Sequence, residues 1–186
     1  MNITQLIVPF PFAHDRLEGL HLTHVIAAIE RETGQAKYAD GEITAETLVR
    51  FEKGFVWERA LSRAFAENLP YRPPSMVYDG ITCSPDGIAY DESAVVPRGG
   101  AIMEYKCTSM RPDKTPVHIP RWLMQVKGYC YVFGIPRAVF LVLHTSIGME
   151  DFCVYSLDFT DDELERNWAS IVNFARSRGM LEGDSQ

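Results

Sequence analysis

The sequence is poor in long apolar runs, in closely paired cysteines and in positive charge, and each shortage excludes a class of protein. No stretch of about eighteen consecutive apolar residues exists, so the sequence contains no candidate transmembrane helix. No two cysteines form a CxxC pair, which argues against a zinc or iron–sulfur knuckle. The formal net charge of -7 argues against a protein that coats nucleic acid with a basic surface.

The N-terminal stretch and the overall composition indicate a soluble globular protein. The opening residues, MNITQLIVPFPFAHDR, lack the basic region and the cleavage site of a secretory signal peptide, so we expect a cytoplasmic location. Hydrophobic residues make up 46% and charged residues 23%, which is typical of a folded protein. A length of 186 residues fits one domain. We predict a single domain over 1–186, with an N-terminal arm and helix in 1–43, a core in 44–160 and a C-terminal helix and tail in 161–186.

The four cysteines fall on apolar segments of different predicted type. We therefore interpret them as buried free thiols rather than as a metal or cluster site. They are Cys83, Cys107, Cys130 and Cys153.

Hydrophobic periodicity and punctuation predict alternating helices and strands. Thr44 is a plausible N-cap and Pro70 a stop for the second helix, and a Thr160–Glu163 capping box opens the last one. Helices are expected over 23–31, 44–69, 120–133 and 160–179. Strands are expected over 76–83, 84–90, 101–108, 137–144 and 151–157. The fold class is therefore α/β (α+β), with a central mixed sheet flanked by helices.

The segments 84–90 and 101–108, read as a hairpin, bring charged residues together. Glu104 and Lys106 lie two residues apart, so they share one face of a strand, and the hairpin places Asp86 beside Glu104. Charges within the apolar string IMEYKC are costly unless they are paired or bind something. Carboxylates and the backbone carbonyl of Tyr105 are the hard oxygen ligands that Mg²⁺ or Mn²⁺ requires.

Two flanking helices offer further side chains to this cluster. Glu58 lies on the helix that precedes the strands and can complete a metal site. Gln125 and Tyr129 lie four residues apart and share one face of the following helix, where they can position a phosphate or the attacking water.

The string SPDGI, followed 18 residues after its Asp by EYK, resembles the PD-(D/E)XK nuclease superfamily. Together with the Gly54-to-Glu58 helix and the Gln125/Tyr129 pair, it is similar to the phage lambda-type exonuclease, YqaJ and RecB-like branch, over roughly residues 50 to 145. The resemblance implies a restriction-endonuclease-like core and a single nuclease domain. It also implies that Glu58, Asp86 and Glu104 are metal ligands. Together with the Tyr105 carbonyl, they are expected to hold one or two Mg²⁺ or Mn²⁺ ions.

The same resemblance assigns the remaining roles. Lys106 is catalytic, orienting or deprotonating the attacking water and offsetting charge in the transition state, while Gln125 and Tyr129 match the auxiliary helix motif. RecB-like iron–sulfur members carry a cysteine set that this chain does not match, so no iron–sulfur cluster is expected. The implied activity is a DNA exonuclease that leaves 5′-phosphates and acts in phage-type recombination or DNA processing, in the bacterial host cell if phage-encoded. A single-strand annealing protein and further copies of the chain are possible partners.

Plainer interpretations exist for each motif. Asp86-Gly87 suits a simple turn, Glu104 and Lys106 suit the solvated face of an edge strand, and Glu58 suits a surface pair with Arg59 or Arg63. Tyr129 suits a core aromatic position. The alternative functions are a structure-specific endonuclease of the same superfamily, a non-catalytic DNA-binding protein with this fold, or a small-molecule enzyme that uses Mg²⁺.

The loop before the helix at 120 holds the best local basic strip, which we predict to contact a DNA backbone. Its residues are Arg111, Lys114, His118 and Arg121. Trp122, next to it, either belongs to the core or stacks on a base. His21 and His24 form an HxxH pair without the Glu of a metalloprotease motif, so we expect a surface or capping role.

Overall fold

The computed structural model describes residues 18–35, 45–64, 73–90, 100–146 and 149–181. The predicted N-terminal arm, the Thr44 cap and the Pro70 stop lie outside these ranges. In chain order the elements are β1 (Leu20–His21), α1 (Leu22–Glu32), α2 (Ala45–Ala64), β2 (Met76–Tyr78), β3 (Ile81–Cys83), β4 (Gly87–Tyr90), β5 (Gly100–Thr108), the 3₁₀ turn η1 (Pro116–His118), α3 (Pro120–Phe133), β6 (Arg137–Ser146), β7 (Met149–Asp158) and α4 (Asp161–Ser177).

The larger sheet has the strand order β4-β5-β6-β7. β4 is antiparallel to β5 and pairs Gly87 with Met103, so the predicted hairpin is confirmed. β5 and β6 are parallel, with Glu104 opposite Phe140, and β7 returns antiparallel to β6. The sheet is therefore mixed, and β6 lies inside it, as its continuous apolar run predicts.

The strand predicted over 76–83 is wrong, because the chain reverses in its middle. Asp79 and Gly80 both have positive φ, 49° and 76°, and they join β2 to β3 as a two-residue hairpin. An Asp-Gly pair favours this turn because both residues tolerate the left-handed region. The segment 84–90 is also strand only from Gly87 onward. β3 pairs on its other edge with β1, in parallel, and completes a small three-stranded sheet in the order β1-β3-β2.

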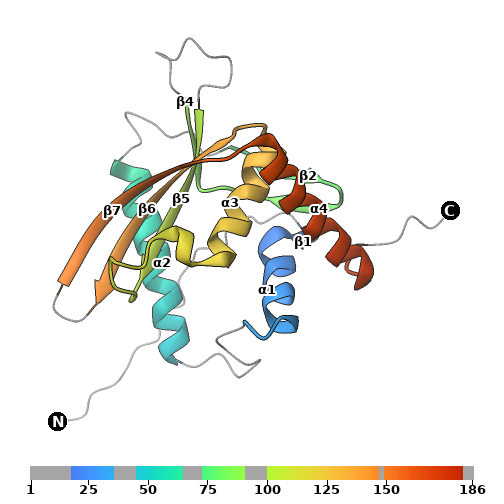
Figure 1. Cartoon of the computed structure of the whole chain (residues 1–186). Coiled ribbons are helices and arrows are strands. Elements are labelled where there is room, and N and C mark those ends of the chain that lie inside the picture. Colours follow the sequence, from blue (N-terminus) through green and yellow to red (C-terminus); the bar gives the residue numbers. More distant parts are fainter. Residues whose placement is uncertain (1–17, 36–44, 65–72, 91–99, 147–148, 182–186) are drawn as a thin grey trace.

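Helices cover both faces of the larger sheet (Figure 1). On one side α1, α3 and α4 bury the main core, in which Val25, Val126 and Ile171 pack with Ile102 and Phe140 of the strands. On the other side α2 buries a smaller core. Its members are Leu61, Met103, Tyr105 and Leu141, with Trp57, Ala89 and Val139 packed against them. The predicted fold class, a mixed sheet flanked by helices, is confirmed.

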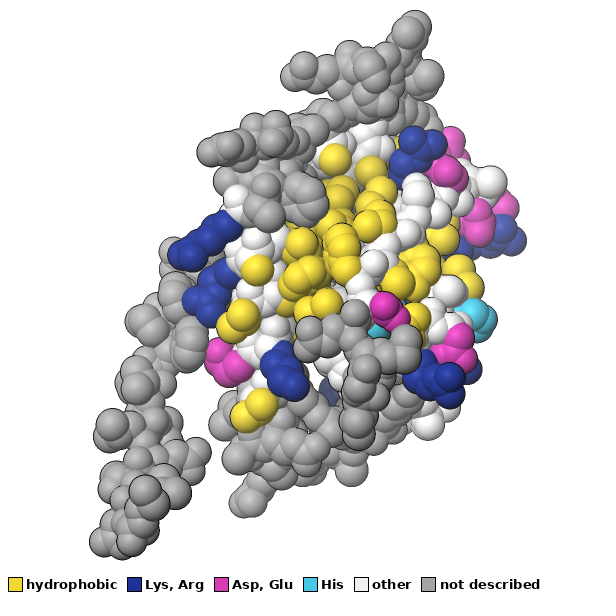
Figure 2. Space-filling view, turned by 90° about the vertical axis from the view of Figure 1, so that its left-hand side faces the viewer, with side chains coloured by type: hydrophobic (Ala, Val, Ile, Leu, Met, Phe, Trp, Pro, Cys, Tyr) yellow, Lys and Arg dark blue, Asp and Glu magenta, His cyan; other side chains and the backbone are white. Residues whose placement is uncertain are grey.

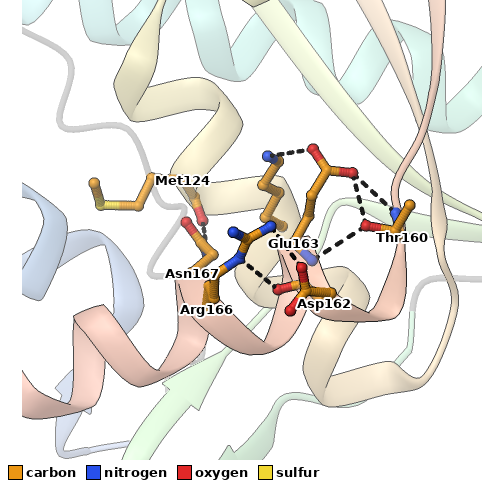
Figure 3. A network of polar contacts seen from close by, with 7 residues as sticks. Met124, Thr160, Asp162, Glu163, Arg166 and Asn167 are labelled. Carbon is orange, nitrogen blue, oxygen red and sulfur yellow. Dashed lines mark hydrogen bonds and ion pairs between the residues drawn. The ribbon is translucent and has the colours of Figure 1, made fainter.

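Local signals set the ends of the last two helices. α3 has Pro120 at its first position, and Gly134, in the left-handed conformation, closes it. The capping box at the start of α4 is present, with Glu163 N–H donating to the Thr160 hydroxyl at 3.2 Å and Thr160 N–H donating to the Glu163 carboxylate at 3.0 Å (Figure 3). Asn167 donates to the Met124 carbonyl at 3.1 Å and so ties α4 to α3.

The face of the sheet that α2 covers only in part carries exposed apolar residues. Phe152 and Val154 of β7 are 51% and 60% exposed, whereas Tyr155 and Leu157 pack against the main core. Figure 2, which looks onto the side where β6 and β7 lie, shows hydrophobic side chains across the middle of this face. None of the helices in the described ranges combines the length and the apolarity that crossing a bilayer requires.

Asp79 should be a stability determinant of the β2–β3 hairpin. Its carboxylate accepts a hydrogen bond of 2.8 Å from the indole N–H of Trp168, which is only 3% exposed. Asp79→Ala removes the acceptor and adds strain at a positive φ, so we expect a loss of about 1–3 kcal/mol in the free energy of unfolding. Asp79→Asn keeps an acceptor and tolerates the backbone, so it should lose less than about 1 kcal/mol. Urea denaturation measures both, and equal losses would contradict this account of the turn.

Candidate functional site

The candidate site lies where β4 and β5 separate. β4 begins at Gly87, directly after Asp86, and pairs with β5 only as far as Met103. From Glu104 to Thr108, β5 is paired with β6 alone among the described strands. Asp86 takes the place of a strand partner, because its Oδ2 accepts the Tyr105 N–H at 2.7 Å. On an extended strand the carbonyl of a residue points to the same edge as its N–H, so the Tyr105 carbonyl faces Asp86.

Glu104 and Lys106 form a pair on the face of β5 that looks toward α3. Lys106 Nζ donates to Glu104 Oε1 at 2.5 Å, and the Glu104 side chain is 3% exposed. Tyr105 points to the opposite face, where it joins the smaller core beside α2. The interpretation of Glu104 and Lys106 as a solvated strand face is therefore wrong.

Gln125 of α3 joins the two charged residues. Its Oε1 accepts from Lys106 Nζ at 3.2 Å, and its Nε2 donates to Glu104 Oε1 at 3.0 Å. The same Nε2 lies 3.1 Å from the hydroxyl of Tyr129, one turn further along the helix. Tyr129 is 3% exposed, so it is both a core aromatic residue and the outer member of this polar chain.

These groups line one cavity of about 690 Å³. α2 contributes Glu58 and Gly54 to its wall, so the structure brings Glu58, Asp86, Glu104, Lys106, Gln125 and Tyr129 to a single space. The cavity is also lined by β1, the start of α1 and the segments around β3, with the polar side chains His21, Thr23, Ser75, Thr82 and Ser84.

The carboxylates of the cavity repel one another. Burial raises the pKa of Asp86 well above its usual value, and the charges of Glu104 and Glu58 raise it further, against the opposing charge of Lys106. Burial also raises the pKa of Glu104, although Lys106 and the Gln125 amide oppose the shift. Such clustered acidic groups gain most from a nearby cation, and a divalent ion is the strongest local cation that a protein binds.

The donor set fits a hard divalent ion. Glu104 Oε2 is buried and has no hydrogen-bond partner, one of two such side-chain atoms in the described part of the chain. An orphaned carboxylate oxygen inside a polar cavity is costly without a ligand. Within the described ranges, no three His, Cys, Asp or Glu side chains are already grouped to hold a metal. Lys106 occupies the other Glu104 oxygen and the Tyr105 N–H occupies Asp86 Oδ2, so Glu104 Oε2 is the oxygen that an ion could take without displacing these contacts.

The predicted basic strip divides in two. Arg121 lines the cavity, and its guanidinium lies 3.6 Å from the Glu30 carboxylate. Arg111, Lys114 and His118 are exposed and lie outside the cavity wall, on the connection from β5 to α3.

Buried His144 at the end of β6 anchors that connection. Its Nδ1 lies 2.9 Å from the Met110 carbonyl, and the Tyr155 hydroxyl donates to the Pro112 carbonyl at 3.4 Å. The basic loop is therefore attached to the sheet next to the cavity rather than projecting freely.

Sequence reasoning missed part of the cavity wall. His21 is only 8% exposed, lines the cavity and makes no side-chain cap hydrogen bond at the N-cap of α1, so the expected surface or capping role is wrong for it. His24 is exposed, so the expected surface role is confirmed for that residue. Thr82 is 3% exposed and lies beside it in the β1–β3 pairing. The parallel pairing of β1 with β3 gave no sequence signal, because β1 has only two residues.

None of the four cysteines forms a disulfide, as expected, but only two of them are buried. Cys83 and Cys130 are buried, and burial raises the pKa of each to about 12. Cys107 and Cys153 are partly exposed, so the prediction of burial is wrong for them. Both lie on strands of the larger sheet, Cys107 on β5 and Cys153 on β7.

No protein-family model and no curated protein sequence matches the chain. Solved structures do match. The crystal structure of SSO0001 has a TM-score of 0.53 at 16% identity, covering 92% of this chain and 81% of that one. LHK-Exo in complex with dAMP has a TM-score of 0.51 at 13% identity, covering 86% and 89%. A further structure of LHK-Exo, described as an alkaline exonuclease from Laribacter hongkongensis, scores 0.49 at 14% identity with the same coverage. At these identities the likeness shows the fold, which is one that a nuclease uses.

Asp86→Asn should stabilise the metal-free protein in a pH-dependent way. A carboxyl with a raised folded-state pKa costs nothing below its ordinary value of 3.8, and it costs progressively more as the pH rises toward the raised pKa. We expect Asp86→Asn to be more stable than wild type at pH 7 in EDTA, because the amide has no charge to bury and is not repelled by Glu104 and Glu58. The gain should vanish near pH 3.5 or below, about the ordinary Asp pKa.

Denaturant unfolding across this pH range measures the gain. Asp113→Asn, an exposed change outside the cavity, controls for the loss of one negative charge. A gain in the free energy of unfolding that is constant with pH would show that the buried charge of Asp86 is not its cause.

Divalent ions should stabilise the wild-type chain through the same carboxylates. An ion that binds the folded state alone adds about 2.7 kcal/mol at a hundred times its Kd. We expect Mn²⁺ to raise the Tm of wild type and to raise that of Glu104→Gln far less. Glu165→Gln, on the exposed part of α4, is the matched control and should keep the full increase. Equal increases in all three proteins would place the ion elsewhere.

Proposed function

We propose that this chain is a metal-dependent DNA nuclease that hydrolyses phosphodiester bonds. The observation that carries the proposal is the convergence of Asp86, Glu104 and Lys106 at the edge where β4 leaves β5, inside a cavity that Glu58 and Gln125 also line. The fold-level likeness to LHK-Exo, a protein described as an alkaline exonuclease, supports it.

The metal ligands in this proposal are the carboxylates of Asp86 and Glu104, the Tyr105 carbonyl and Glu58, around one or two Mg²⁺ or Mn²⁺ ions. When bound, such an ion polarises a phosphoryl oxygen and lowers the pKa of a coordinated water. The Glu104 oxygen without a partner is the group with most to gain from it.

Lys106 supplies the fixed positive charge of the site. Because it is ion-paired with Glu104, it acts as an ammonium that orients the attacking water and offsets negative charge on the phosphoryl oxygens in the transition state. Gln125 fixes the Lys106 and Glu104 side chains relative to each other, because its amide oxygen accepts from Lys106 and its amide nitrogen donates to Glu104. Tyr129 in turn fixes the Gln125 amide, so both residues act through the pair rather than on the phosphate.

The finer part of the proposal is an exonuclease that leaves 5′-phosphates in phage-type recombination or DNA processing. DNA enters along the exposed basic strip of Arg111, Lys114 and His118, with Arg121 at the cavity wall. A single-strand annealing protein as partner, assembly of several copies and a cytoplasmic location belong to the same proposal. A structure-specific endonuclease of the same fold is the competing activity, and closed circular DNA distinguishes the two.

Nuclease activity on end-labelled linear DNA and on closed circles, with Mg²⁺, Mn²⁺ or EDTA, tests the proposal. We expect wild type to digest linear DNA with metal, to leave 5′-phosphates and to spare circles. Lys106→Ala should lower the rate by roughly a hundredfold or more, because it removes a preorganised charge from the transition state. EDTA should abolish the activity.

Lys127→Ala is the matched control, since Lys127 lies on α3 outside the cavity wall and pairs with Glu163. It should keep nearly full activity. Cleavage of circles would establish the endonuclease instead. DNA binding with no metal-dependent cleavage of any DNA or RNA substrate would overturn the nuclease proposal in favour of a binding protein.

A further inference from the structure

Trp122 lies in the first turn of α3 and forms part of the cavity wall beside Lys106. Its ring stacks on Phe140 of β6, with centroids 6.0 Å apart and planes 26° apart, and the residue is 8% exposed. Phe140 is fully buried, so it fixes the plane of the indole. Trp122 is therefore a rigid wall rather than a mobile rim residue, and it has little surface left on which a DNA base could stack.

The ammonium of Lys106 lies over this ring, 5.8 Å from its centroid. A lysine ammonium has three N–H donors, and two of them are directed to Glu104 Oε1 and Gln125 Oε1. The electron-rich face of an indole is the best aromatic acceptor for the remaining positive charge. The Lys106 side chain is 19% exposed, so water screens this attraction only in part.

Residues 122, 125 and 129 are three and four positions apart, so Trp122, Gln125 and Tyr129 present one face of α3 to the charged pair on β5. The Gln125 amide and the Trp122 ring meet Lys106 from neighbouring positions on that face. Gln125 also donates a hydrogen bond to Glu104, so a change at Gln125 would disturb the lysine and the carboxylate together. Trp122 contacts the lysine without any hydrogen bond to the carboxylate.

We propose that Trp122 is a positioning residue for Lys106, holding the ammonium at the cavity wall through a cation–π contact. The expected effect on kcat rests on the proposed nuclease function, whereas the contact between Trp122 and Lys106 does not. With Trp122 in place, Lys106 keeps one orientation toward the phosphate; without it, the long side chain samples several rotamers while Glu104 and Gln125 still hold it in part.

Substitutions that separate aromatic character from volume test the kinetic consequence. Trp122→Leu should lower kcat roughly 5- to 30-fold, the range that a partly desolvated cation–π contact corresponds to, with KM changed less than about twofold. Trp122→Phe keeps a weaker aromatic face and should recover activity to within about threefold of wild type. Each variant is assayed well below its own Tm, so that unfolding caused by the lost core volume does not lower the measured rate.

Trp168→Phe is the control for losing a buried indole. Trp168 is 3% exposed and lies in α4, where it packs with Tyr131 and bonds Asp79, away from Lys106. We expect its kcat and KM to match those of wild type. Equal losses of kcat in Trp122→Leu and Trp122→Phe, or a rise in KM alone, would overturn the positioning role.

A spectroscopic readout tests the contact without any activity. Lysine ε-methylene protons that lie over an indole resonate upfield through the ring current, and Lys106→Arg identifies the resonance in protein labelled with ¹³C-lysine. We expect the Lys106 signal to be shifted upfield in wild type and in Trp168→Phe, and to return to the ordinary lysine position in Trp122→Leu. An ordinary position in wild type would overturn the contact even if the chain is a nuclease. An upfield signal in a chain that cleaves no DNA would retain the contact and reject the nuclease function.

Discussion

The ion pair between Glu104 and Lys106, buried on one strand beside a second carboxylate, is the constraint on which the rest of the site depends. A carboxylate with 3% of its side chain exposed is costly, and Lys106 offsets only one of its two oxygens. Asp86 adds a second negative charge at the point where its backbone leaves the sheet. Each further contact, from the Tyr105 N–H to the Gln125 amide, lowers the cost of holding these charges together without removing it. The residual repulsion is what a cation would relieve in the proposed site.

This arrangement arises because β4 is shorter than β5 and pairs with only the first part of it. β4 stops pairing at Gly87, while β5 continues for five residues under the cover of α3 on one face and α2 on the other. Packed helices on both faces therefore hold in place charged side chains that would move apart in a looser structure. The main core around Phe140 stabilises the fold away from this cluster. The start of α4 does so as well, through its capping box and the hydrogen bond from Asn167 to the Met124 carbonyl.

Much of this could be predicted from the sequence, for identifiable reasons. Alternation on β5 fixed which face holds Glu104 and Lys106, the hairpin placed Asp86, and helical spacing placed Gln125 over the pair. The missing parts involve contacts that no local pattern encodes. Asp79-Gly80 is a strong turn signal, but it lies inside the segment 76–83, whose flanking residues favour a strand on both sides. The pattern therefore predicts one strand where the structure has β2 and β3. His21 and Thr82 reach the cavity through a parallel pairing of two residues, too short to leave a periodicity. Trp122 contacts Lys106 only because Phe140, from a distant strand, sets the plane of its ring.

A crystal of the chain soaked in Mn²⁺ tests the central claim most directly, because manganese is located by its anomalous scattering independently of the protein atoms. The account predicts an anomalous peak in contact with carboxylate oxygens of both Asp86 and Glu104, with the Glu104 oxygen that now lacks a partner among the ligands. A well-ordered cavity with both carboxylates in place and no peak between them, at Mn²⁺ concentrations that saturate any thermal stabilisation, would contradict it.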